Sequence, residues 1–434
     1  MSSPPLKTIA KAPSIWLGWV LARLFLIYLL LNEKGPLGDV RYYLEGVYGT
    51  NPSDMTEYPQ VGTWPSVLLA WLTGYDFERY AIGFTAMMLL ADATFLALLL
   101  RHHRSTPGAY SAGWFWVFFG TAAGHVFTWR LDLYPALLVA GAGALLATRP
   151  RLASVLLAWA TAAKLWPGVL AAGLVGRATS RATWQRLAAF FGSLIALCIG
   201  VAAMTSMDRV LSPLTYQGER GLQIESLAAT WFVYQAHRQP DVWTMGYAAS
   251  KSYEISGPGV DTAIVLSSIA MGAALVWIVG VALVHFLRGN WSPHSTLVFF
   301  IAAILLLIAT NKVFSPQYIV WLGPILAVTL RSPIPAPPTA SKKVAADIRG
   351  IRAIIAVLAV GTAALGTVIY PYGYNYIWLH VGENPNPVYA LLLRNLLILA
   401  MTAFAVYWHL LEYRVARANQ TRGDRRGRIT RQSG

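Results

Sequence analysis

The stretch LLLNEKGPLGDVRYYLEGVYG, residues 29–49, joins the end of a long apolar run to a polar segment that carries Asp39 and Tyr42. The apolar run, residues 15–33, approaches the roughly 20 residues that an α-helix needs to cross a membrane. A polar segment directly after such a helix is either an ordinary aqueous loop or part of a site at the membrane surface. The side of the membrane that it faces, and what else faces that side, decide between the two.

The composition places the whole chain among membrane proteins. Of its 434 residues, 56% are hydrophobic and 12% are charged, and the mean hydropathy is +0.50. Soluble domains carry about 25% charged residues. The 34 Lys and Arg residues against 19 Asp and Glu give a net charge of +15, but the basic residues form short clusters between apolar runs, as cytoplasmic loops do. This pattern argues against nucleic acid as a partner.

Hydropathy predicts about twelve membrane-spanning helices. The clear candidates are residues 15–33, 80–100, 111–129, 186–205, 262–287, 293–311, 350–370 and 388–411, and the shorter ones are 133–148, 152–165, 167–177 and 318–331. We interpret the first run as a retained signal-anchor helix, because no small-residue cleavage pattern follows it. The single cysteine, Cys198, lies in an apolar run, so we expect a small buried hydrophobe and no intramolecular disulfide.

The placement of Lys and Arg predicts the orientation. With the N-terminus in the cytoplasm, every basic cluster falls inside, and the long segments of about 34–79 and 206–261 fall outside. We therefore expect a multi-pass plasma-membrane protein with both termini cytoplasmic and its site on the periplasmic or exterior face. Within the first long segment, the apolar residues 61–74 are too short to span and predict an interfacial helix.

The chain divides into four predicted parts. Residues 1–331 form the membrane module, 332–349 a flexible Pro- and Ala-rich cytoplasmic linker, 350–413 a C-terminal helix pair, and 414–434 a basic tail too polar to pack and therefore disordered.

Asp39 is the first candidate functional residue. A carboxylate near lipid is partly desolvated, which raises its pKa toward a value useful for a general base. Asp39 also precedes a helical pattern, so an N-cap is the competing interpretation. Asp54 and Glu57 lie in the same external segment and remain alternative bases.

Cations near membrane depth are the second group of candidates. Lys164 lies in WATAAKLWPG and Lys312 in ATNKVFSPQYIVWL, each beside a proline that breaks the helix. Charged residues at this depth are functional candidates, and they suit phosphate binding. A snorkelling side chain is the alternative for Lys164 and a polar turn is the alternative for Lys312. Gln317 and Tyr318 add hydrogen-bonding groups next to Lys312.

Arg220, Gln223 and Glu225 lie in GERGLQIESLAAT, which we expect to be an external amphipathic helix. Its Arg suits bidentate phosphate contact, and a solvated helix face is the alternative. Asp92, in the middle of an apolar run, favours an interhelical hydrogen bond over a proton relay. His125 is a weaker acid–base candidate. No motif for an obligatory metal or cofactor is present.

The order of these pieces resembles glycosyltransferase family 87, integral membrane enzymes of the GT-C superfamily found in actinobacteria. The resemblance covers most of residues 15–331: Asp39, Tyr58-Pro59, RLDLYPALL with Arg130 and Asp132, AAKLWPGVL, RGLQIES and NKVFSPQYIVWLGP. It implies an all-α GT-C fold and an inverting mannosyltransferase that uses polyprenyl-phosphate mannose to extend a cell-envelope glycolipid of the phosphatidylinositol mannoside or lipomannan type.

The resemblance also implies roles for residues of this chain. Asp39 would be the base, and Lys164, Arg220 and Lys312 would bind the donor phosphate. The expected substrate-binding residues are Arg41, Tyr42, Glu57, Tyr58, Arg130, Asp132, Gln223, Glu225, Gln317 and Tyr318. The partners are the polyprenyl-phosphate sugar, the glycolipid acceptor and membrane lipids. An arabinofuranosyltransferase with a polyprenyl-phosphate arabinose donor, a lipid or solute transporter, and a membrane scaffold remain alternatives.

Overall fold

A computed structural model describes residues 11–51, 54–218, 220–289, 291–332 and 342–432, and it is predominantly helical. Within this part, seven helical segments are long and apolar enough to cross a membrane: Ala12–Asn32, Phe77–Leu100, Arg181–Met204, Val260–Arg288, Pro293–Thr310, Ala346–Trp378 and Asn386–Arg414. The protein is therefore a multi-pass helical membrane protein, as its composition predicts.

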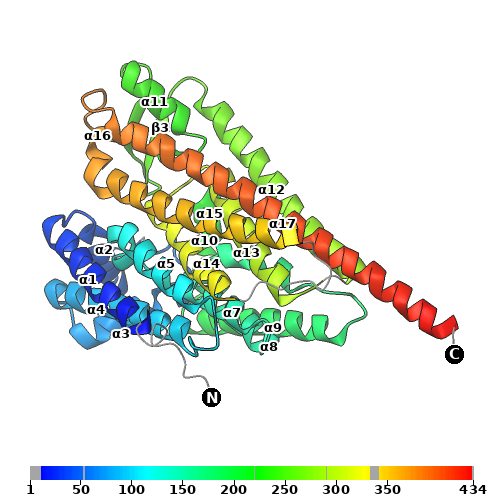
Figure 1. Ribbon diagram of the computed structural model, residues 1–434. Coiled ribbons are helices and arrows are strands. Elements are labelled where there is room, and N and C mark those ends of the chain that lie inside the picture. Colours follow the sequence, from blue (N-terminus) through cyan, green and yellow to red (C-terminus); the bar gives the residue numbers. More distant parts are fainter. Residues whose placement is uncertain (1–10, 52–53, 219, 290, 333–341, 433–434) are drawn as a thin grey trace.

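The helices that carry these segments are α1 (Lys11–Asn32), α4 (Phe77–Leu100), α9 (Arg181–Met204), α12 (Val260–Arg288), α13 (Pro293–Thr310), α15 (Lys342–Thr367) and α17 (Asn386–Gln432). Shorter helices lie between them: α5 (Ala109–Ala122), α6 (Gly124–Thr128), α7 (Leu133–Leu145), α8 (Pro150–Ala163), η2 (Trp166–Leu174), η3 (Pro316–Trp321) and α14 (Leu322–Arg331). In Figure 1, α17 runs from beside α16 at the upper left to the lower right.

One clear candidate span, residues 111–129, is not a single continuous helix. It is divided into α5 and α6 at Gly124, whose φ of +57° is a left-handed conformation that interrupts a right-handed helix. A Cβ on this glycine would also lie 2.6 Å from the Thr367 hydroxyl, so the break allows α15 to approach closely. The four short candidates are also helical, but they are too brief to count by length. Length and hydropathy therefore support seven spans among the described residues, where the sequence predicts about twelve.

The two long polar segments, about 34–79 and 206–261, carry their own secondary structure. The first contains α2 (Leu37–Tyr48) and α3 (Gln60–Thr73), and the second contains α10 (Met207–Gly218) and α11 (Thr230–Arg238). The second also holds three short strands, β1 (Leu222–Gln223), β2 (Thr244–Tyr247) and β3 (Tyr253–Ser256). They form an antiparallel sheet in the order β1-β3-β2. An all-α class did not predict this small sheet. Its strands are too short to stand out in the sequence.

Helix α3 carries the residues expected to lie at a membrane interface. Its Leu68, Trp71 and Leu72 are more than half exposed, while Val61 and Leu69 pack inward. An apolar outer face of this kind is what an interfacial helix presents to lipid.

The mid-membrane acid Asp92 joins three helices. Its carboxylate accepts hydrogen bonds from Arg23 at 2.6 and 3.0 Å, from Trp19 at 2.8 Å and from Trp116 at 2.7 Å. Arg23 and Trp19 belong to α1, Asp92 to α4 and Trp116 to α5. The predicted interhelical hydrogen bond is confirmed. Asp92 also forms an ion pair with Arg23, which was not predicted.

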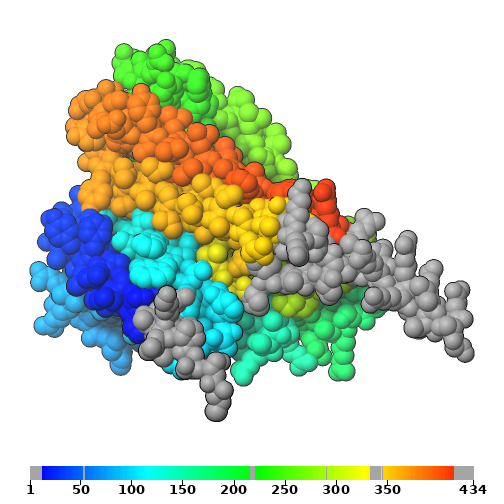
Figure 2. Space-filling view, in the orientation of Figure 1, coloured from blue at the N-terminus to red at the C-terminus, as the bar shows by residue number. Residues whose placement is uncertain are grey.

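The C-terminal helices are part of the same packed body. Figure 2 shows α15 bordered by α5 on one side and by α17 on the other. Past α15 the chain breaks at η4 (Val368–Gly373), which contains Pro371, and continues as α16 (Tyr374–Trp378). This break lies beside the two long polar segments and places Tyr370 in a cavity that their residues also line.

The predicted linker differs from what the structure shows. Residues 333–341 of the linker lie outside the described residues, and α15 already begins at Lys342. The backbone of α17 continues as a helix to Gln432, and the disorder expected for the tail stays a prediction. Extending an existing helix avoids the cost of nucleation, and Ala, Arg and Gln are good helix formers.

Candidate functional site

A polar cavity of about 330 Å³ lies where the two long polar segments meet the broken helices. It is lined by residues from α2, the loop before α3, the turn after α6, the end of α8, the sheet region, η3 and the C-terminal break. These residues are Gly38, Asp39, Tyr42, Glu57, Tyr58, Arg130, Lys164, Arg220, Gln223, Tyr247, Lys251, Ser252, Tyr253, Ser315, Pro316, Gln317, Tyr318, Tyr370 and Tyr374.

Most of the predicted site residues meet in this cavity. The ten that line it are Asp39, Tyr42, Glu57, Tyr58, Arg130, Lys164, Arg220, Gln223, Gln317 and Tyr318. The four that do not are Arg41, Asp132, Glu225 and Lys312. Residues separated by more than 270 positions in the sequence therefore share one enclosed space.

Asp39 and Arg130 form the central ion pair of the cavity. The Arg130 Nη2 atom lies 2.5 Å from Asp39 Oδ2, and it also donates to the Tyr370 hydroxyl at 2.8 Å. The N-cap interpretation of Asp39 is wrong, because α2 begins at Leu37 and its N-cap residue is Pro36. Asp39 instead lies in the first turn, where the helix dipole favours a negative charge.

The environment of Asp39 makes its carboxylate more basic than that of a surface aspartate. Its side chain is 41% exposed, toward the cavity, while that of Arg130 is only 4% exposed. Enclosure by protein raises the pKa of Asp39 above its ordinary value, and the nearby Asp132 raises it further, while Arg130 opposes both. The carboxylate is therefore both reachable from the cavity and easier to protonate than a surface aspartate.

Lys164 reaches the same cavity from the end of α8. Its Nζ lies 2.7 Å from Oδ1 of the fully buried Asp132, which also accepts from the Trp321 indole at 2.6 Å. The ammonium lies 5.0 Å from the centre of the Tyr58 ring, a cation–π geometry. The snorkelling alternative is wrong, since Lys164 turns toward a buried acid. Asp132 supports Lys164 from behind the wall and does not line the cavity.

A second polar group surrounds Tyr42. Its hydroxyl donates to Glu57 and accepts from Lys251 Nζ at 2.8 Å and from the Met55 amide at 2.6 Å. Lys251 lies 3.4 Å from Asp54, which does not line the cavity. Lys251 comes from the turn between β2 and β3, and sequence reasoning missed it because that turn was read as an undifferentiated loop.

Gln223 links the sheet to the chain before η3. Its backbone amide donates to the Lys312 carbonyl at 3.1 Å, and its side-chain oxygen accepts from the amides of Phe314 and Glu225. The amphipathic helix expected here is wrong, because Leu222 and Gln223 form β1 and pair with β3. Gln223 remains on the cavity wall and is 3% exposed.

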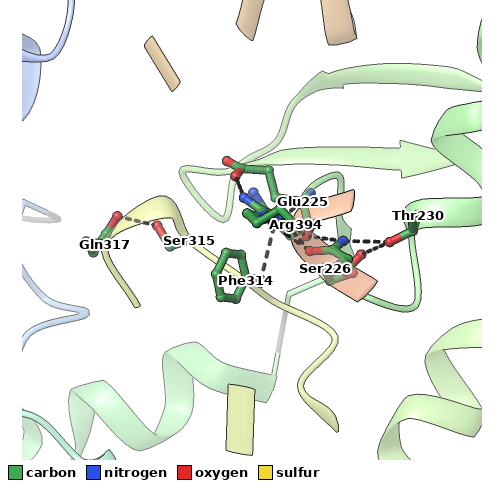
Figure 3. Close-up of polar contacts among 9 residues, drawn as sticks. Glu225, Ser226, Thr230, Phe314, Ser315, Gln317 and Arg394 are labelled. Carbon is green, nitrogen blue, oxygen red and sulfur yellow. Dashed lines mark hydrogen bonds and ion pairs between the residues drawn. The ribbon is translucent and has the colours of Figure 1, made fainter. Parts of the chain in front are cut away.

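Glu225 has a structural environment outside the cavity. Figure 3 shows it against Arg394 of α17, with which it forms a fully buried ion pair. The Arg394 guanidinium also lies 4.4 Å from the centre of the Phe314 ring. Phe314 immediately precedes Ser315, which donates to Gln317 at 2.7 Å. This network thus holds the segment that carries four cavity residues, Ser315, Pro316, Gln317 and Tyr318, and the solvated-face alternative for Glu225 is wrong.

Arg41 and Lys312 are the other two residues placed elsewhere. Arg41 lies on the exposed side of α2, with its guanidinium 3.9 Å from the centre of the Phe77 ring. One helical position separates it from Tyr42, and this rotates it away from the cavity. Lys312 is half-buried in the polar turn before η3 and contributes its carbonyl to Gln223.

His125 does not take part in the cavity. It is buried in α6, and its Nε2 lies 3.1 Å from the Glu33 carbonyl. Across the described ranges, no group of three or more His, Cys, Asp or Glu side chains is arranged to hold a metal ion.

Aromatic residues complete the walls. Seven of the lining residues are tyrosines: Tyr42, Tyr58, Tyr247, Tyr253, Tyr318, Tyr370 and Tyr374. Sequence reasoning predicted three of them, and the four it missed come from the sheet and from the C-terminal break, which lie far from any recognised motif. Tyrosine rings present a flat apolar face and a hydroxyl, a combination that suits ligands with both apolar and hydroxyl-bearing surfaces.

Comparison with known proteins adds no identification: no protein-family model, no curated protein and no solved structure matches the chain.

Proposed function

We propose that this protein is an inverting membrane glycosyltransferase of GT-C architecture that transfers mannose from polyprenyl-phosphate mannose to a cell-envelope glycolipid. The observation that carries the proposal is the convergence of ten predicted site residues in one cavity. In the sequence these residues are candidates for a base, for phosphate-binding cations and for substrate contacts, and they lie in distant parts of the chain. A chain without such a site would have no reason to bring them together.

The chemistry of the cavity supports a sugar phosphate as ligand. Four cations line it, namely Arg130, Lys164, Arg220 and Lys251, together with two acids, Asp39 and Glu57. The tyrosines offer rings that can pack on sugar C–H faces and hydroxyls that can bond to sugar hydroxyls. Cations and tyrosines together fit a ligand that carries both a phosphate and a saccharide.

In the proposed reaction, Asp39 accepts the proton of the acceptor hydroxyl as its oxygen attacks the anomeric carbon. The new C–O bond forms while the bond between the anomeric carbon and the phosphate oxygen breaks, and polyprenyl phosphate leaves with that electron pair. The raised pKa of Asp39 makes its carboxylate a better proton acceptor than an ordinary aspartate. Glu57 also lines the cavity and is the alternative base.

Cations would stabilise the charge that develops on the leaving phosphate. We assign this phosphate-binding role to Lys164 and Arg220, as the sequence predicts, and to Lys251. Lys312 does not line the cavity and has no such role in the proposal. Arg130 would have a role in addition to phosphate binding. A phosphate that competes for its guanidinium would weaken the pair with Asp39, so donor binding would release the base for catalysis.

The position of the cavity supports donor access from the membrane. Tyr370 lines the cavity just beyond the C-terminal end of α15, so the cavity lies at one end of this membrane-spanning helix. The prenyl tail would lie in lipid while the sugar enters the cavity between broken helices, which are tolerated at membrane depth when they line a polar space. We place this cavity on the exterior face, with both termini cytoplasmic, and we count the short helices toward about twelve passes.

Two observations weigh on the rival functions. A transporter would use Asp92 as a relay, but Arg23, Trp19 and Trp116 already occupy its carboxylate. A scaffold would not require two acids and four cations around one cavity. The arabinose donor remains the nearest alternative, since both donors share the polyprenyl phosphate.

The test is sugar transfer by the purified protein in lipid. We expect transfer of radiolabelled mannose from polyprenyl-phosphate mannose to a membrane glycolipid extract, with inversion at the anomeric carbon. Transfer from the arabinose donor alone would change the sugar and keep the reaction class. If neither donor is used, while a lipid or solute crosses protein-containing vesicles, the protein is a transporter and the proposal fails.

A further inference from the structure

A second cavity, of about 640 Å³, lies between α5 and α15 at the opposite end of the molecule from the proposed active site. Its residues come from the start of α5, the end of α14 and the first turns of α15. They are Pro107, Gly108, Ser111, Phe115, Leu330, Ser332, Arg349, Arg352, Ala353, Ala356 and Val357. The border between α5 and α15 that forms it lies on the face seen in Figure 2.

The two cavities face opposite membrane surfaces. Arg352 and Tyr370 belong to the two ends of one helical segment, and the 1.5 Å rise per residue separates them by roughly 25 Å. This distance approaches the roughly 30 Å thickness of the hydrocarbon core. Arg331, at the end of α14, donates to the carbonyls of Leu99 and Arg101, so the ends of α4 and α14 gather at the same surface as this cavity.

One end of the cavity is positively charged. Arg352 is only 7% exposed, and its Nη2 donates to the carbonyls of Thr329 and Leu330 at 2.7 and 2.9 Å. Its Nε and Nη1 atoms have no hydrogen-bond partner among the described residues, which leaves donors for a ligand. Arg349 lies one turn earlier on the same face of α15, and the first turn of α5 adds the positive end of a helix dipole.

No acid is among the described residues that line the cavity. Asp347 precedes Arg349 by two positions, and this places it on another face of α15. Glu412, whose charge influences Arg352, already accepts from His294 at 3.0 Å and from Trp408 at 3.2 Å. The cations of this cavity are therefore available to an external anion.

The other end of the cavity is apolar. Phe115 lies one turn beyond Ser111 on α5, and Ala353, Ala356 and Val357 continue along α15, with Val357 71% exposed. A cationic end joined to an apolar groove along two helices has the polarity of a phospholipid. Basic pockets between membrane helices on the cytoplasmic side are known to bind anionic headgroups.

We infer that this cavity binds one anionic phospholipid, with its phosphate at Arg349 and Arg352 and an acyl chain along Phe115, Ala356 and Val357. The site is separate from the proposed active site and does not depend on its chemistry. Its occupant would hold α15 against α5 and thereby stabilise the helix whose end, at Thr367, lies three residues before Tyr370 of the first cavity.

Native mass spectrometry of the full chain in mild detergent tests the inference. The protein is titrated with phosphatidylglycerol and, separately, with phosphatidylcholine of the same acyl chains. We expect tighter binding of phosphatidylglycerol by the wild type and roughly fivefold weaker binding by Arg349→Gln, as about 1 kcal/mol for each cation near the surface implies. Arg181→Gln, which removes an exposed cation at the start of α9, is the matched control and should leave the affinity unchanged.

Ala356→Trp tests the apolar end, because the indole fills the groove while both arginines remain. It should weaken the binding of phosphatidylglycerol. Equal affinity of the wild type for the two lipids, or equal losses in Arg349→Gln and Arg181→Gln, would overturn the inference in favour of diffuse attraction. Displacement of the lipid by inorganic phosphate alone at a similar concentration would also overturn it, since the apolar groove would then contribute nothing.

Discussion

Two Asp–Arg pairs of this protein have the same chemistry and different surroundings. Asp92 and Arg23 are both almost fully buried, and donors from α1 and α5 saturate the carboxylate. Asp39 faces a cavity with 41% of its side chain exposed, and Arg130, with which it forms an ion pair, also donates to the Tyr370 hydroxyl. The first pair has no room for a substrate, whereas the second leaves part of its carboxylate open to one.

The difference separates a structural acid from a candidate catalytic acid. An acid that is fully bonded and sealed contributes to stability through partners that cannot be exchanged. An acid with a cavity beside it and a partner that can be drawn away can change its protonation state during a reaction.

Asp39→Asn should reduce the rate of sugar transfer by about 10²- to 10⁴-fold, because it removes the proposed general base and retains the shape of the side chain. The assay is donor turnover per folded molecule in lipid. Asp39→Glu, which keeps the carboxylate, should retain more activity than Asp39→Asn. If Asp39→Asn keeps full activity and Glu57→Gln loses it, the base is Glu57.

Asp92→Asn should affect stability and leave the chemistry intact. It leaves Arg23 as an unpaired buried charge, a change that costs about 3–5 kcal/mol in comparable pairs. The thermal midpoint of the protein in detergent should fall markedly, while the transfer rate per folded molecule stays near that of the wild type. A stable Asp92→Asn protein that has lost activity would contradict the structural role and revive a relay.

Arg130→Gln should move the acidic limb of the pH–rate profile to higher pH. Burial raises the pKa of Asp39 and Arg130 opposes that rise, so removing Arg130 raises this pKa further. The active form is the carboxylate, and a higher pKa means that more alkaline solution is needed to form it. Arg130→Lys keeps the positive charge and should leave the limb close to that of the wild type. A limb that stays in place in Arg130→Gln would show that Asp39 does not control it.

Tyr370→Phe should have the smallest effect. It removes the 2.8 Å hydrogen bond to Arg130 and keeps the ring in the cavity wall. Loss of one such bond is worth about 1 kcal/mol, or roughly fivefold in turnover. Tyr372→Phe, on the neighbouring exposed surface, is the matched control and should leave turnover unchanged. Equal effects of the two substitutions would remove Tyr370 from the positioning of Arg130.

Hydropathy predicted the membrane class and seven of the eight clear spans, because about 20 apolar residues have few other uses. The eighth failed at Gly124, whose left-handed backbone a hydropathy average does not detect. The small sheet escaped prediction because none of its strands is longer than four residues and because β1 pairs with residues about 30 positions away, as Leu222 does with Ile255.

The candidate site was partly predictable for a related reason. Asp39, Arg130 and Lys164 are charged residues near the ends of apolar runs. Placing a charge close to the membrane costs free energy, so such residues stand out in the sequence as functional candidates. Tyr370 and Lys251 carry no such mark, since a tyrosine beside a membrane helix and a lysine in a loop are common. Glu225 was misplaced because its partner, Arg394, lies 169 residues away on α17.

The most direct test of the central claim is an experimental structure of Asp39→Asn in lipid with intact polyprenyl-phosphate mannose. The substitution should stop turnover and trap the donor. The proposal predicts a sugar in the tyrosine-lined cavity, its phosphate within hydrogen-bond distance of Lys164, Arg220 or Lys251, and its anomeric carbon turned toward residue 39. A donor that binds elsewhere, with this cavity empty at saturating donor concentration, would contradict it.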